Sequence, residues 1–124
     1  MRLSLIAAVS IGAIAGALLR FGFQRWLNVS TLSPMGTFIV NVAGSMLIGF
    51  LVGSFGHRPV GAWYYGMTAG FCGSLTTFSS ITMEVFEMFR LKEVVRAAAY
   101  LLATFALGMA GVVLGYWLGM KMHR

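Results

Sequence analysis

The most unusual segment of this chain reads Gly70-Phe-Cys-Gly-Ser-Leu-Thr-Thr-Phe-Ser-Ser-Ile-Thr82. From Ser74 to Thr82, six of the nine residues carry hydroxyl groups, and two glycines precede them. We expect a helix that is interrupted here, since exposed backbone inside a membrane is tolerated only where protein or a polar cavity satisfies it. The alternative is a continuous helix whose Ser and Thr hydroxyls bond carbonyls of their own preceding turn.

This segment lies within one of four long stretches without charged side chains, at residues 3–19, 26–56, 59–83 and 97–120. A membrane-crossing helix needs about 20 mostly apolar residues. The composition agrees, because the chain is 59% apolar and only 10% charged, whereas globular domains carry roughly 25% charged residues. The sequence therefore predicts an all-α membrane protein with one transmembrane domain, residues 1–124, and helices at about 3–27, 35–56, 61–89 (with a break near 73–78) and 97–121.

The charged residues exclude several other classes. The net charge of +6 is divided among short groups that flank the apolar stretches, which is typical of membrane loops and not of a nucleic-acid surface. The chain has no Asp, and neither a metal-ligand spacing nor a Ser-His-acid set is present, so we expect no enzyme. Leu3 to Ala17 also resembles a secretory signal, but three spans would remain after its removal.

The basic residues are also divided almost evenly between the two ends of the predicted spans. Because the positive-inside rule then has little to act on, we hypothesise that the chain inserts in both orientations and that oppositely oriented copies pair. Four crossings place Arg2, Arg58, Lys121 and Arg124 on one side, and Arg20, Arg25, Arg90, Lys92 and Arg96 on the other.

Small residues recur at four-residue steps in three of the helices. Such stripes let helix backbones approach closely in a membrane. We expect much of this surface to lie between copies of the chain, and packing within one copy is the alternative. The stripes are Ala8, Gly12 and Gly16; Ser45, Gly49 and Gly53; and Gly111, Gly115 and Gly119.

Three neutral polar residues, Asn41, Tyr100 and Thr104, fall inside the predicted spans. Polar side chains at membrane depth face the bundle interior or a pathway, although Asn41 alone is equally consistent with a hydrogen bond between helices. Together with the hydroxyl-rich segment they indicate a donor-rich route for a small anion, with Arg20 attracting it at the mouth. The ring edge of Phe78 carries positive partial charge and suits the same route.

Three motifs, Gly16-Ala-Leu-Leu-Arg20, Gly36-Thr-Phe-Ile-Val-Asn41 and Gly73-Ser-Leu-Thr-Thr-Phe-Ser79, appear in this order and spacing. In them, and over essentially its full length, the chain resembles the Fluc (CrcB-type) fluoride channels. The resemblance implies an antiparallel, dual-topology homodimer in the lipid bilayer of the bacterial inner membrane, which passively exports fluoride.

The resemblance also implies roles for individual residues. Asn41 would be an amide donor in the pore, Phe78 the first ring of a phenylalanine box, and Arg20 a vestibule residue. A structural Na⁺ is expected at the dimer centre, held by backbone carbonyls of Gly73 and Thr76 from both copies. The residues implied for the pore are Asn41, Phe78, Ser79, Ile81, Glu84, Tyr100 and Thr104, of which Tyr100 and Thr104 form a polar track and Glu84 lies beyond the box.

The chain departs from the family pattern at two positions. Ile81 stands where a second box phenylalanine is expected, and Gly108 stands where a third hydroxyl of the track is expected. Two other functions remain open at this point. A small dual-topology, proton-coupled multidrug exporter would need a deep carboxylate, which the first helix lacks. A noncatalytic scaffold subunit would use the glycine stripes to bind another membrane protein.

Overall fold

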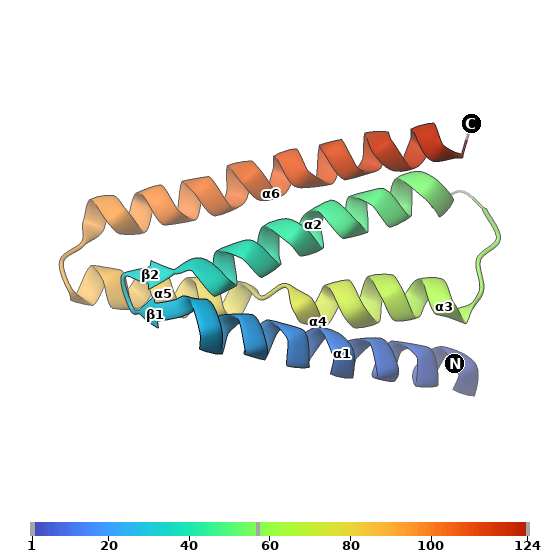
Figure 1. The fold of residues 1–124 in the computed structure, drawn as a ribbon, viewed down its shortest axis with the longest axis horizontal. Helices are drawn as coiled ribbons and strands as arrows, with labels where there is room; N and C mark the ends of the chain where they lie inside the picture. Colours follow the sequence, from blue (N-terminus) through green and yellow to red (C-terminus); the bar gives the residue numbers. More distant parts are fainter. Residues whose placement is uncertain (1, 57, 124) are drawn as a thin grey trace.

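The computed structural model describes residues 2–56 and 58–123. Three of its helices are long and apolar enough to cross a membrane: α1 (Leu3–Leu27), α2 (Met35–Phe55) and α6 (Val94–Met122). A fourth, segmented rod runs beside them, and all four lie roughly parallel (Figure 1). The start of α1 and the end of α6 lie at the same end of the bundle, as four crossings require.

The fourth rod consists of α3 (Ala62–Tyr65), a π-helix η1 (Gly66–Cys72), α4 (Gly73–Leu75) and α5 (Phe78–Arg90). Between α4 and α5 the backbone is extended, with φ −82° and ψ 153° at Thr76 and φ −149° and ψ 119° at Thr77. Gly73 itself is helical, with φ −63° and ψ −29°. The winding is thus interrupted at two threonines, whose branched side chains favour extended backbone.

The connection between α1 and α2 is a short antiparallel hairpin, which the all-α expectation missed. Strand β1 (Asn28–Ser30) pairs with β2 (Ser33–Pro34). In the sequence, the cluster of Asn28, Ser30, Thr31, Ser33 and Pro34 predicts only a turn here. Strands of two and three residues carry too little alternation of apolar and polar residues to be recognised.

At the other boundaries the helices begin and end close to the predicted positions. The largest difference is at α6, which begins at Val94 and not near residue 97. A tight turn precedes it, in which Lys92 has a φ of 61° and the N–H of Glu93 donates to the carbonyl of Met88 at 2.8 Å. The helix therefore includes Arg96, which the sequence placed in the loop.

The glycine stripes lie between helices of one chain, which corrects the expectation that they mainly join copies. A Cβ atom at six of these glycines would overlap the backbone of a neighbouring helix, so the helices approach more closely there than other residues permit. Gly12 and Gly16 face η1 and α4, Gly49 and Gly53 face α6, and Gly115 and Gly119 face α2.

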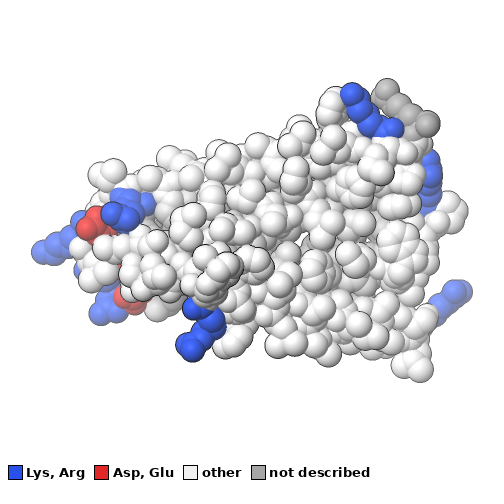
Figure 2. Space-filling view, viewed as in Figure 1, with Lys and Arg blue, Asp and Glu red and all other residues white. Residues whose placement is uncertain are grey.

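Charged side chains gather toward the two ends of the molecule and leave a broad uncharged band between them (Figure 2). Many large apolar side chains in this band are exposed, including Ile11 at 69% and Phe105 at 71%. The buried core is correspondingly small, as is typical of a protein that meets lipid over most of its exterior. Arg124, one of the basic residues assigned to an end above, lies outside the described residues.

Candidate functional site

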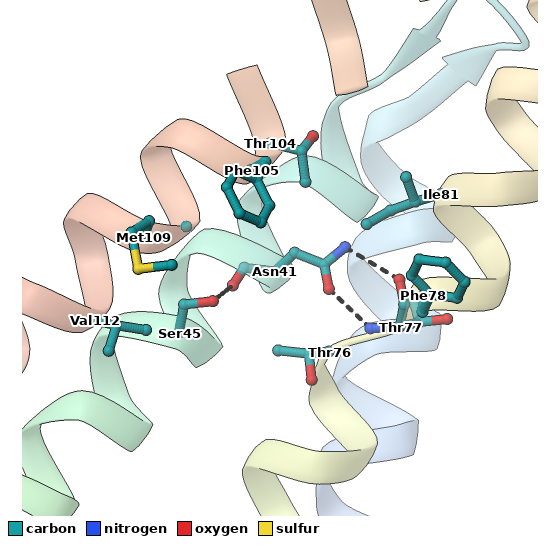
Figure 3. A pocket seen from close by; sticks show the side chains of 11 residues that line it. Asn41, Ser45, Thr76, Thr77, Phe78, Ile81, Thr104, Phe105, Met109 and Val112 are labelled. Atoms are coloured by element: carbon teal, nitrogen blue, oxygen red, sulfur yellow. Dashed lines mark hydrogen bonds between the residues drawn. The ribbon is translucent and has the colours of Figure 1, made fainter. Parts of the chain in front are cut away.

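A pocket of about 360 Å³ lies beside the interruption between α4 and α5. Its walls come from α2, from the two extended threonines, from α5 and from α6 (Figure 3). All 11 lining residues are uncharged, and they mix an amide and four hydroxyl groups with apolar side chains. They are Asn41, Ser45, Thr76, Thr77, Phe78, Ile81, Thr104, Phe105, Gly108, Met109 and Val112.

The side-chain amide of Asn41 bonds the backbone of the interrupted segment. Its Oδ1 accepts a hydrogen bond of 2.7 Å from the N–H of Thr77, whose partner in a continuous helix would be the carbonyl of Gly73. Its Nδ2 also donates to the carbonyl of Thr77, at a long 3.4 Å (Figure 3). Because an amide nitrogen carries two protons, Asn41 still has donor capacity for a ligand in the pocket.

Thr104 brings a second donor to the pocket. The residue is 8% exposed, and its hydroxyl is buried without a hydrogen-bond partner among the described residues. Leaving a buried polar group unpaired costs about 1–3 kcal/mol, so such a group requires an explanation. A ligand that accepts a hydrogen bond would supply one. The Ser45 hydroxyl lies nearby and donates to the carbonyl of Asn41 at 2.7 Å.

Phe78 and Ile81 line the same pocket in different ways. The Phe78 ring is 78% exposed, whereas Ile81 is 8% exposed and packs with Val85 and Met88 in the core cluster. The residue at the second box position is therefore a buried packing residue in this chain. At the other departure, Gly108 offers no side chain, and a Cβ atom there would lie 3.5 Å from the Ser45 Oγ.

Glu84 and Tyr100 lie outside the pocket lining, in a second polar cluster. The Tyr100 hydroxyl donates to Glu84 Oε2 at 2.6 Å. Glu84 Oε1 accepts from the Thr37 hydroxyl at 2.5 Å and from Asn28 Nδ2 at 3.3 Å. The Tyr100 hydroxyl thus points toward the carboxylate of Glu84 on α5, because a half-buried carboxylate requires hydrogen-bond donors.

A continuous set of hydrogen bonds joins this cluster to the interruption. Gln24 Nε2 donates to Thr37 Oγ1 at 3.1 Å and to Ser80 Oγ at 3.2 Å. The N–H of Ser80 in turn donates to Thr77 Oγ1 at 3.2 Å. Ser79, which the resemblance places in the pore, is exposed, and its hydroxyl lies 3.2 Å from Thr77 Oγ1 and outside the pocket lining.

Arg20 lies against the segmented rod. Its Nε donates to the carbonyl of Ser74 at 3.0 Å, and its Nη1 donates to Gln24 Oε1 at 3.3 Å. In a continuous helix the Ser74 carbonyl would accept from the N–H of Phe78. Arg20 thus satisfies a carbonyl beside the interruption, in addition to placing positive charge near it.

Sequence reasoning missed four polar residues of the site, Gln24, Asn28, Thr37 and Ser45, and included Ser80 only as part of the hydroxyl-rich segment. A signal for two of them was present, because Gln24 and Asn28 continue the four-residue step from Gly16 and Arg20 along one face of α1. Thr37 is 0% exposed, and it lies next to the glycine that opens the second quoted motif.

Fold and site together define a multi-pass membrane protein with an uncharged, donor-lined pocket at an interrupted segment. The chain belongs to the CrcB family: the family model described as "CrcB-like protein, Camphor Resistance (CrcB)" matches residues 7–116. This membership confirms the resemblance drawn from the three motifs.

Several relatives resemble the chain over nearly its whole length, and each is named a fluoride-specific ion channel FluC. A relative from Pseudomonas putida is 36% identical over 126 residues, which is 98% of each chain. One from Paracidovorax citrulli is 39% identical over 118 residues, covering 94% of this chain and 90% of the relative. One from Ignicoccus hospitalis is 32% identical over 117 residues, covering 94% and 95%.

Proposed function

We propose that this protein is a fluoride-selective channel that passively exports fluoride across the bacterial inner membrane. The observation that carries the proposal is the uncharged pocket, in which Asn41 and Thr104 retain unused donor capacity. Relatives at 36% and 39% identity that are named fluoride-specific channels support the choice of ion.

Neutral donors suit the passage of a small, strongly hydrated anion. Hydrogen bonds from amide and hydroxyl groups replace part of the hydration shell, and conduction requires sites that bind the ion without trapping it. A fixed cation in the pocket would hold fluoride too tightly, and a carboxylate would repel it. The uncharged lining of the pocket avoids both effects.

We further propose that the channel is an antiparallel homodimer. The nearly even division of basic residues between the two ends favours insertion in both orientations. The rings of Phe78 and Phe105 line the pocket and yet are 78% and 71% exposed. A second copy on this side would cover both rings and enclose the pocket, while the glycine stripes are already used within the chain.

The carbonyls of Gly73 and Thr76 fit the structural Na⁺ that the family implies. In a continuous helix they would accept from the N–H groups of Thr77 and Ser80. These two groups donate instead to Asn41 Oδ1 and to Thr77 Oγ1. The freed carbonyl oxygens suit a hard cation, and its charge would balance the dipoles of the interrupted segment.

A growth experiment tests the proposed function. Bacteria whose own fluoride exporter has been deleted are expected to regain growth on fluoride-containing medium when they express this chain. A proton-coupled exporter would depend on a proton gradient, so fluoride efflux from vesicles is expected to be the same with and without a proton gradient across their membrane. Failure to restore growth, with the chain present in the membrane, would contradict the proposal.

Replacing Phe78 is expected to slow fluoride efflux from vesicles containing the purified chain. The Phe78→Ile change removes the polarised ring edge at the pocket, an interaction of about 1 kcal/mol or roughly fivefold in rate. Because the Phe78 side chain is exposed on the surface of the single chain, the fold of the chain should tolerate the change. Phe86→Ile is the matched control, since Phe86 is also an exposed ring of α5 but does not line the pocket. Equal efflux by the two variants would remove the ring from the mechanism.

A further inference from the structure

We propose that Asn28 is a positioning residue of the channel, which sets the orientation of Glu84 and of the Thr37 proton. The inference rests on the proposed function and assigns a role to a residue in the hairpin between α1 and α2. Asn28 makes four hydrogen bonds to three other residues: its oxygen accepts from two backbone N–H groups, and its nitrogen donates to two side-chain oxygens.

The oxygen of the Asn28 amide caps α2. Oδ1 accepts from the N–H of Gly36 at 2.7 Å and from the N–H of Thr37 at 3.3 Å. The residue directly before the helix, Pro34, makes no side-chain cap. Asn28 therefore accepts from two N–H groups in the first turn of α2 although it lies outside the helix. This role requires the oxygen of its amide to face α2.

The nitrogen of the amide must then point the other way, toward the polar cluster. Nδ2 donates to Thr37 Oγ1 at 3.0 Å and to Glu84 Oε1 at 3.3 Å. An amide flip would place its oxygen against the carboxylate and its N–H₂ group against backbone donors, so only one orientation satisfies all partners.

This orientation determines where the Thr37 proton goes. The Thr37 hydroxyl accepts from Asn28 and from Gln24, which uses both acceptor positions of its oxygen. Its single proton is left for Glu84 Oε1. Asn28 thus acts on the carboxylate twice, once by direct donation and once through Thr37.

Glu84 borders a cavity that is large enough for an ion. A second pocket, of about 240 Å³, adjoins the cluster between the hairpin and α5. Asn28 and Glu84 both line this pocket, together with Ser30 of β1. Glu84 therefore lies between this pocket and the series of hydrogen bonds that leads to Thr77. The orientation of its carboxylate determines which neighbouring donors bind the carboxylate and which remain free to bind an ion.

The Asn28→Asp change separates the two roles of the amide. Aspartate is as good a helix cap as asparagine, so the acceptor for α2 remains, while both donations are lost. Fluoride efflux from vesicles is expected to slow by about fivefold, the equivalent of one ordinary hydrogen bond. Val29→Asp is the control, because it adds the same charge to the same hairpin at an exposed residue that lines neither of the two pockets. Its efflux is expected to stay close to that of the unaltered chain.

A double-mutant comparison distinguishes positioning from a structural role. If Asn28 acts through Glu84, Asn28→Asp should no longer slow efflux in a Glu84→Gln background, since the glutamine amide can donate to the introduced carboxylate. A change that only weakens the hairpin would slow efflux equally in both backgrounds.

An infrared measurement gives a readout that does not depend on transport. The chain contains only three acidic residues, Glu84, Glu87 and Glu93, so ¹³C-labelled glutamate yields few carboxylate bands and Glu84→Gln identifies one of them. That band is expected to shift in Asn28→Asp and to stay in place in Val29→Asp. If the unaltered chain passes no fluoride, the proposed function is wrong. The position of the Glu84 band would still show whether Asn28 orients Glu84. An unshifted band, or equal efflux by the two aspartate variants, would overturn the inference.

Discussion

Asn41→Asp is expected to abolish fluoride efflux while the chain remains folded. The aspartate keeps an oxygen for the N–H of Thr77, the 2.7 Å bond that closes the interruption, and it has nearly the same shape. It replaces a neutral donor with a negative charge in the lining of the pocket. Two like charges 4 Å apart repel by about 4 kcal/mol in partly buried surroundings, which corresponds to roughly a thousandfold in rate.

The measurement is the initial rate of fluoride release from vesicles, recorded with a fluoride electrode. Elution volume in detergent shows whether the variant has kept its assembly, and Val29→Asp again serves as the control for added charge outside the two pockets. Efflux by Asn41→Asp within tenfold of the unaltered chain would show that Asn41 does not contact the ion.

Thr104→Val is expected to separate transport from stability. The two side chains have nearly the same volume, and the hydroxyl of Thr104 has no partner to lose within the described ranges. Removing an unsatisfied buried donor should leave the melting temperature unchanged or raise it. Efflux should fall by up to about a hundredfold, because a hydrogen bond to a charged group contributes about 1.5–3 kcal/mol.

Thr68→Val is the matched control for this change. Thr68 lies in η1, away from the pocket, and its hydroxyl donates to the carbonyl of Tyr64 at 2.8 Å. This variant should conduct like the unaltered chain. A Thr104→Val protein that melts much earlier would instead indicate that the hydroxyl has a structural partner, and unchanged efflux would exclude it from the ion path.

Much of the fold could be predicted because the lipid environment leaves few choices. Long uncharged stretches require helices, and α1 spans Leu3–Leu27, as the stretch and its flanking arginines predict. The position of the interruption was harder to predict. The predicted break near residues 73–78 contains the two extended residues, Thr76 and Thr77, but the sequence does not single them out. Their conformation depends on an acceptor, Asn41, that is 36 residues away in the sequence.

The site was predictable only in part for a similar reason. A polar residue inside an apolar stretch is visible in the sequence, and so Asn41 and Thr104 were found. The direction of a side chain is not visible. Tyr100 and Thr104 are one helical turn apart, but only Thr104 lines the pocket, since the Tyr100 hydroxyl donates to Glu84. Asn28 lies in a loop, where asparagine is common, and its role follows from contacts with α2 and α5.

The most direct test of the account is a paired recording of fluoride and chloride efflux from lipid vesicles that contain only the purified chain. An uncharged pocket lined by neutral donors predicts that fluoride leaves rapidly, without a proton gradient and without another protein, while chloride is retained. Vesicles that keep their fluoride, or that lose both ions at similar rates, would contradict it.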